Sequence, residues 1–285
     1  MQQFKLRHIV TTTMLSLMLL LGLFNHQPAF AATPYLYGVD SSDIVTDASI
    51  SEATNFLGET PSFWGRYFEG PFGGRCTDPQ PFTSLEYEPS QENQPLSSNN
   101  IALLPVASST LDVSSSSVHC AQKDAQVQAQ TFLKYLGEND LVSQGKEFYI
   151  FLDVEESEPP LNPTYYLAWS QAIKNASTSQ VKLLPGVYMS VADNASAEQL
   201  NSSIAGGAIC SGLWIAGYPY PEGWKGSLPS WNEGYEATPE TPVKCPVLIW
   251  QFAQNLDTVF DLDMLNPQYA EQTLDRLAVP PSSTF

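Results

Sequence analysis

Basic side chains and histidine are scarce in this sequence, and both shortages exclude kinds of function. The 285 residues include 12 lysines and arginines, 30 aspartates and glutamates and three histidines, which gives a formal net charge of −18. Nucleic acids and anionic membrane surfaces are bound through clustered lysine and arginine side chains. Neither is therefore an expected partner.

No apolar run beyond the N-terminus is long enough to cross a bilayer. At the N-terminus, Lys5 and Arg7 precede an apolar stretch over 14–24, and a small-x-small motif ends at Ala31. This order is typical of a cleaved secretory signal peptide. It predicts a signal peptide over 1–31 and one secreted or extracytoplasmic domain over 32–285, without membrane contact after cleavage. An uncleaved N-terminal anchor is the alternative.

Cysteine is also rare, and its even count is informative. The four cysteines are Cys76, Cys120, Cys210 and Cys245, and behind a signal peptide they predict two disulfides. Of the three connectivities, we favour Cys76–Cys120 and Cys210–Cys245, because each pair brackets a loop-rich segment. Long spacings argue against a zinc site. Since His119 is the one histidine beyond the signal peptide, we expect no catalytic triad, metal or cofactor.

Apolar runs of strand length alternate with helical patterns along the rest of the chain. Strands are predicted at 35–40, 62–68, 101–108, 147–155, 183–190, 212–218, 247–253 and 259–265. Capping patterns predict helix starts at Ser49, Asn162, Ser196 and Asn266. The alternation favours an α/β fold, a single-domain (β/α)8 TIM-type barrel of regular or modified form. A doubly wound open sheet is the runner-up, although no glycine-rich phosphate turn follows the first strand.

Two predicted connections are longer than ordinary loops. Residues 69–100 are rich in proline, glycine, serine and asparagine, and are interpreted as a disulfide-stapled excursion or a functional loop. Residues 219–245 carry Tyr220, Trp224, Trp231 and Tyr235. These rings are interpreted as a platform for sugar faces, with a small satellite core as the alternative.

Acidic side chains stand where predicted strands end. Alternation along 148–155 places Asp153 and Glu155 on the face opposite Ile150, Leu152 and Val154. The aliphatic face suits packing against helices. The acids are therefore predicted to point into the barrel, at the end of the strand where barrel active sites form.

Other predicted strands repeat this pattern. Asp40 ends the first strand, and Asp261 and Asp263 form an i, i+2 pair in the last. Grouped carboxylates raise one another's pKa values, so that one can protonate a glycosidic oxygen while another stabilises the transition state. Helix capping, pairing with Arg66 and a Ca²⁺ site are the alternatives.

The motifs resemble those of a known enzyme family. "GVDSS", "FLDVE", "PGVYMS", "LWIAGY", "WQFA" and "VFDLDML" occur in the same order as the recurrent motifs of family 25 glycoside hydrolases, secreted lysozymes that cleave the muramic acid linkage of peptidoglycan. "WGRYF" is more similar to a sister group, the glycoside-hydrolase-like domains of unknown function in secreted bacterial proteins. The resemblance spans 35–266 and implies a modified (β/α)8 barrel with an acidic pocket.

The resemblance also implies residue roles. Glu155 matches the proposed catalytic acid of the Asp-x-Glu motif, Asp153 its partner and Asp40 the first-strand aspartate. Asp261, or else Asp263, matches the last-strand aspartate. The residues assigned to substrate binding are Arg66, Tyr67, Tyr188, Trp214, Tyr218, Trp250 and Gln251. Arg66 departs from the lysozyme pattern, and an arginine near the pocket would lower carboxylate pKa values and weaken a general acid.

The sequence therefore predicts a secreted glycoside hydrolase that cleaves peptidoglycan or a related amino-sugar polymer by carboxylate acid/base chemistry. A non-catalytic carbohydrate-binding or cell-surface protein on the same barrel is the first alternative. A hydrolase of another bond, such as an amidase, is the second. The net charge counts against an anionic cell-wall substrate.

Overall fold

The computed structural model describes residues 35–69, 76, 86–108, 112–155, 159–218, 227–231, 237, 239–254 and 259–282. All of them belong to one compact unit, Tyr35–Phe285. The predicted signal peptide lies outside the described residues and stays a prediction. Among the helices described, none combines the length and apolar character that a membrane crossing needs.

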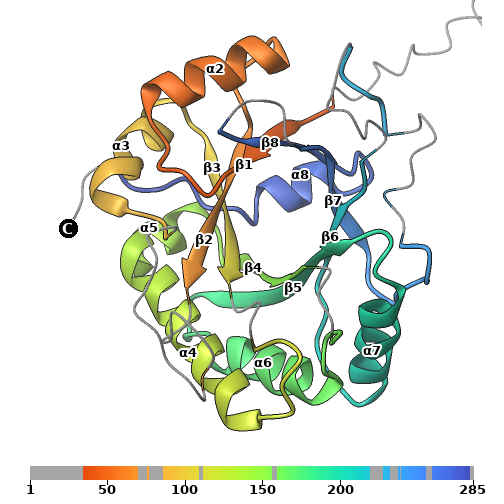
Figure 1. Ribbon diagram of the computed structural model, residues 1–285. Helices are drawn as coiled ribbons and strands as arrows, with labels where there is room; N and C mark the ends of the chain where they lie inside the picture. The colour runs from red at the N-terminus through yellow and green to blue at the C-terminus, as the bar shows by residue number, and fades with distance from the viewer. Residues whose placement is uncertain are drawn as a thin grey trace, which may run out of the picture. The chain divides into compact units, whose positions relative to one another are not determined.

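Eight strands close into a barrel in chain order, which confirms the predicted barrel fold (Figure 1). The strands are β1 (Tyr37–Asp40), β2 (Phe63–Glu69), β3 (Ala102–Ser108), β4 (Glu147–Val154), β5 (Lys182–Ser190), β6 (Leu213–Ala216), β7 (Val247–Ala253) and β8 (Asp261–Leu265). The helices are α2 (Asp47–Leu57), α3 (Pro89–Ser98), α4 (Val118–Leu136), α5 (Glu138–Gln144), α6 (Pro163–Asn175), α7 (Asn194–Ala205) and α8 (Ala270–Leu274).

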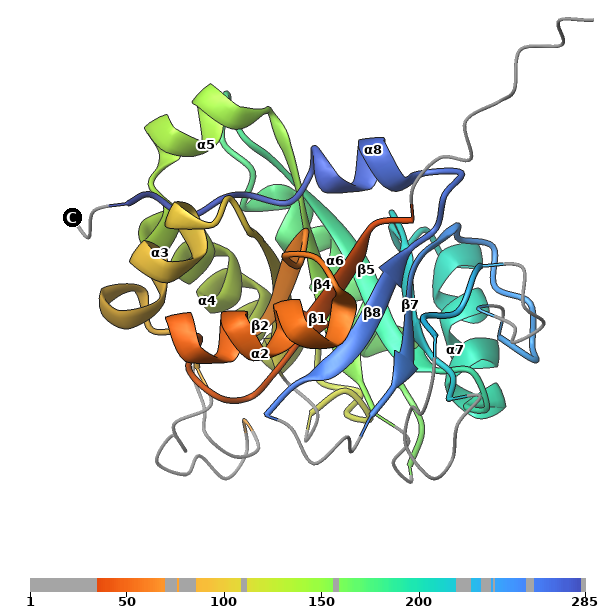
Figure 2. The same cartoon turned by 90° about the horizontal axis from the view of Figure 1, so that it is seen from above.

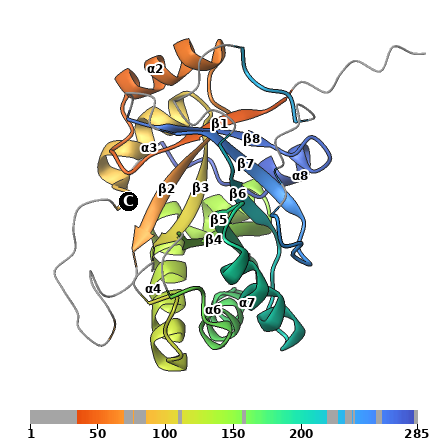
Figure 3. The ribbon, with the colours of Figure 1, turned by 45° about the vertical axis from the view of Figure 1, so that its right-hand side comes forward.

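The helices lie outside the barrel. Helix α4 packs against α6, which in turn contacts α7 and β5 (Figure 3). Side chains alternate between two cores, as predicted for β4. Tyr149 and Phe151 belong to the cluster inside the barrel, whereas Ile150, Leu152 and Val154 belong to the cluster under the helices.

The last strand departs from a regular TIM barrel. Strands β1 to β7 pair in parallel, but β8 runs antiparallel to both β7 and β1 (Figure 2). Residues 254–260 join β7 to β8, and this connection is too short for the crossover that a parallel pair requires. Asp261 therefore begins its strand instead of ending it, yet it pairs directly with Asp40.

Helix starts were predicted with mixed success. Asn162 caps α6, and its side-chain oxygen accepts a hydrogen bond from the Thr164 amide at 2.9 Å. The prediction for Ser49 is wrong, because Thr46 is the cap of α2 and Ser49 is its capping-box partner. Ser196 is likewise not a cap, since Asp193 occupies that position in α7. The helix expected from residue 266 begins at Ala270 and ends at Leu274.

The two long connections are described in part. Helix α3 lies within 69–100, and its polar, proline-containing sequence gave no helical pattern. Tyr220, Trp224 and Tyr235 lie outside the described residues. Trp231 packs edge-on against Trp250, with ring centroids 6.1 Å apart, which favours the satellite-core interpretation for this ring.

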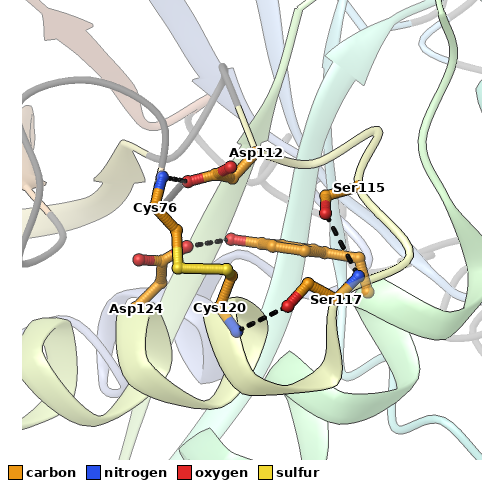
Figure 4. The surroundings of a disulfide bond; sticks show 7 residues. Cys76, Asp112, Ser115, Ser117, Cys120 and Asp124 are labelled. Carbon is orange, nitrogen blue, oxygen red and sulfur yellow. Dashed lines mark hydrogen bonds between the residues drawn. A yellow bond between two sulfur atoms is a disulfide. The ribbon is translucent and has the colours of Figure 1, made fainter. Parts of the chain in front are cut away.

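Both predicted disulfides are present. Cys76–Cys120 has a Cα–Cα distance of 5.7 Å and joins the connection after β2 to the first turn of α4. The Asp112 carboxylate accepts a hydrogen bond from the Cys76 amide at 2.6 Å, and the Ser117 hydroxyl caps α4 by accepting from the Cys120 amide (Figure 4). Cys210–Cys245, at 5.9 Å, ties the segment after α7 to the approach of β7.

Gly186 in β5 occupies a point where the barrel interior has no room for a side chain. An added Cβ would lie 2.6 Å from the Phe151 ring and 2.9 Å from the carbonyl oxygen of Gly212. We expect Gly186→Ala to lower the free energy of unfolding by about 1–3 kcal/mol, measured by urea denaturation. Gly145→Ala is the matched control, because its nearest neighbour would be 3.5 Å away. Equal denaturation midpoints for the two variants would contradict the expected crowding.

Candidate active site

Acids from three strands surround one tyrosine of a fourth. Burial, followed by the negative charges of Asp153, Asp40, Glu155 and Asp261, raises the pKa of the Tyr67 phenol far above its ordinary value. These carboxylates therefore lie around a single side chain of β2. The predicted convergence of the acids on one mouth of the barrel is present in the structure.

The acids differ in how far they are withdrawn from water. Asp40 and Asp153 are 6% and 2% exposed, whereas Asp261 is half-buried and Glu155 is exposed. Burial, reinforced by the charge of Asp261, raises the pKa of Asp40 to about 7. Burial and the charges of Glu155 and Asp40 raise the pKa of Asp153 well above its ordinary value. The site thus combines buried carboxyl groups that retain protons with one that solvent reaches.

Asp263, the second choice for the last-strand aspartate, lies deepest of all. It is fully buried and accepts a hydrogen bond from Trp214 Nε1 at 2.8 Å. Burial, followed by the negative charge of Asp40, raises the pKa of Asp263 well above its ordinary value. The two buried carboxyl groups therefore do not titrate independently.

A hydrogen-bond donor holds Asp40 from the side of β7. Gln251 Nε2 donates to Asp40 Oδ2 at 2.6 Å. The side-chain oxygen of Gln251 accepts from the Tyr188 hydroxyl at 2.8 Å and from the Tyr218 hydroxyl at 2.6 Å. These bonds fix which atom of the amide faces Asp40. Trp214 therefore contacts Asp263, and Gln251 connects Tyr188 and Tyr218 to Asp40.

Two other predicted substrate-binding residues, Trp250 and Arg66, do not contact these acids. The indole of Trp250 donates to the Gly217 carbonyl at 2.8 Å, and its ring packs in the outer core. Arg66 is fully buried on the face of β2 opposite Tyr67, where it binds Glu92 through two bonds of 2.6 and 2.9 Å. The expectations that Arg66 binds substrate and lowers the carboxylate pKa values are therefore wrong.

The Arg66–Glu92 pair instead supports one wall of the site. Arg66 Nη1 donates to the Ser41 carbonyl at 2.7 Å, directly after Asp40. Glu92 accepts the Val45 amide at 3.1 Å as well. The pair thereby fixes the loop between β1 and α2 at both ends.

A pocket of about 280 Å³ opens beside this loop. The residues that line it are Asp40, Ser41, Ser42, Asp43, Tyr67, Val259, Phe260 and Asp261. Near it, the buried Asp153 Oδ1 has no hydrogen-bond partner among the described residues. No group of three or more His, Cys, Asp or Glu side chains in the described part of the chain is arranged to hold a metal ion.

Comparisons with known proteins add the following. No protein-family model matches the sequence, and no curated protein matches it either. Among solved structures, the catalytic domain of the endolysin Ply40 from bacteriophage P40 of Listeria monocytogenes is similar, with a TM-score of 0.46 and 13% identity. The match covers 85% of this chain and 98% of that domain. A likeness of this size carries no functional argument, and the resemblance to family 25 stays a prediction.

Proposed function

We propose that the protein is a glycoside hydrolase that acts on peptidoglycan or a related amino-sugar polymer outside the cytoplasm. The domain over 32–285 would carry the activity once the signal peptide, 1–31, is removed. The main support is the meeting of Asp40, Asp153 and Glu155 around Tyr67, beside an open pocket. In the part of the chain that the structure describes, no lysine or arginine pairs with these three acids.

Each acid has a role that its surroundings favour. Glu155 is exposed at the end of β4, where it can meet a glycosidic oxygen. It would transfer its proton to that oxygen as the bond to the anomeric carbon breaks, and water would add to the carbon. Asp40, whose pKa of about 7 leaves it partly ionised near neutral pH, would supply the negative charge that stabilises the oxocarbenium-like transition state. Asp153, whose pKa is raised further by burial, would position the water. Gln251, which donates to Asp40, would hold it in place.

Digestion of purified peptidoglycan and of chitin tests this function. We expect soluble fragments that carry new reducing ends, measured by a reducing-sugar assay and mass spectrometry. Release of peptides without reducing ends would indicate an amidase instead. Saturable binding of either polymer without any product would indicate a carbohydrate-binding protein on the same barrel.

A further inference from the structure

The charge around the pocket indicates which amino sugar the site takes, an inference that rests on the proposed function. We infer that the pocket beside Asp40 and Asp261 binds a hexosamine unit whose amino group is free and protonated, in preference to an N-acetylated one. The preferred substrate class is thus a de-N-acetylated amino-sugar polymer.

The lining of the pocket is the first support. Asp40, Asp43 and Asp261 all line it, and none of its described lining residues is basic. An ammonium group is attracted by the carboxylates at the pocket, whereas an acetamide carries no charge to attract. A sugar that bears a carboxylate of its own would be repelled. Among amino sugars, the site therefore favours the cationic form.

The second support is a buried carboxyl oxygen that lacks a hydrogen-bond partner. Asp153 is 2% exposed, and its Oδ1 has no hydrogen-bond partner among the described residues. A buried polar atom without a partner is costly, and a ligand that bonds to it recovers that loss. An ammonium group offers three N–H donors, whereas an acetamide nitrogen offers one. Asp153 does not line the pocket itself, but it pairs with Tyr188 across β4 and β5, and Tyr188 is connected through Gln251 to Asp40, which does.

Aromatic rings and the net charge act in the same direction. The Tyr67 ring and the Phe260 ring line the pocket. Ring faces attract ammonium groups through cation–π interactions. A formal charge of −18 on the whole chain also steers a cationic polymer toward the protein.

Binding of two matched oligosaccharides tests the inference. Glucosamine hexamers, one with free amines and one fully N-acetylated, are titrated calorimetrically into Glu155→Gln at pH 6. We expect the free-amine hexamer to bind about 10-fold more tightly at low salt, with a smaller advantage at high salt because charge interactions are screened. Equal or tighter binding of the N-acetylated hexamer at low salt would overturn the inference. So would binding of CaCl2 alone at lower concentration than the free-amine hexamer.

A rim substitution tests whether the preference comes from the pocket. Asp43 is exposed at the pocket edge, and Asp43→Asn should lower the preference for the free-amine hexamer about 2–5-fold. Asp47→Asn is the matched control, since it removes the same charge from an exposed residue that does not line the pocket. If both variants lose the preference for the free-amine hexamer equally, the preference comes from net charge, and its assignment to this pocket is overturned.

The same experiments separate this inference from the proposed function. Cleavage of N-acetylated polymer without binding of the free-amine hexamer would overturn the inferred preference for free amines and would leave the proposed glycoside hydrolase activity supported. Preferred, salt-sensitive binding of the free-amine hexamer without cleavage of any polymer would support the inferred preference and contradict the proposed glycoside hydrolase activity.

Discussion

Replacing Glu155 by glutamine should lower kcat on the polymer about 10²–10⁴-fold and leave the affinity for it within a few-fold. Glutamine keeps the size of the side chain but has no acidic proton to give, and general acid catalysis contributes about this much. Glu155 is exposed, so the fold should not change. Initial rates of reducing-end release measure the effect, with thermal unfolding as a check on folding.

A chemical control distinguishes acid catalysis from a loss of binding. An aryl glycoside whose leaving group departs without protonation should lose much less rate in Glu155→Gln than the polymer does. Glu52→Gln, an exposed change on α2, should leave both rates unaltered. If Glu155→Gln keeps more than about a tenth of kcat while Asp153→Asn does not, the acid is Asp153 and the assignment of roles is wrong.

Local alternation was enough to predict part of the site. In β4 the aliphatic residues occupy one face, so Asp153 had to face inward, and the structure places it there. The position of Asp40 followed from the same reasoning. Both predictions needed only the side-chain period of a strand, which is independent of tertiary structure.

The direction of β8 and the place of Arg66 could not be obtained in that way. Antiparallel pairing of β8 depends on the length of the connection before it, and it is this pairing that sets Asp261 opposite Asp40 and Asp263 opposite Gly38. β2 carries large aromatic residues on both faces, so its pattern does not show which side is the interior. The partner of Arg66, Glu92, lies in a helix without a recognisable apolar face.

The buried acids should make the protein less stable as the pH rises from about 4 to about 8. Asp40 has an ordinary pKa of 3.8 and a folded pKa of about 7, and burial raises the pKa values of Asp153 and Asp263 as well. Over this interval the unfolded chain has released protons that the folded chain still binds. The unfolded state therefore binds fewer protons, and the free energy of unfolding falls with increasing pH.

The pKa change of Asp40 sets the size of this fall in the free energy of unfolding. A pKa change from 3.8 to about 7 corresponds to about 4 kcal/mol, present below pH 4 and lost above pH 7. Because the charge of Asp40 raises the pKa of Asp263, the contributions of these two groups do not simply add. Tm measured between pH 4.5 and pH 8 should therefore decrease steadily, opposite to the usual behaviour of paired carboxylates.

Asp263→Asn isolates the contribution of the site from that of overall charge. Asparagine can still accept from Trp214 Nε1, but it cannot ionise. We expect this variant to have a higher Tm than the wild type at pH 8 and nearly the same Tm at pH 5. Its Tm should therefore fall less steeply with pH. Glu59→Gln, which removes the same charge from an exposed position, should keep the wild-type slope. A wild-type Tm that is constant between pH 5 and pH 8 would mean that water reaches these carboxyl groups, and it would contradict their raised pKa values.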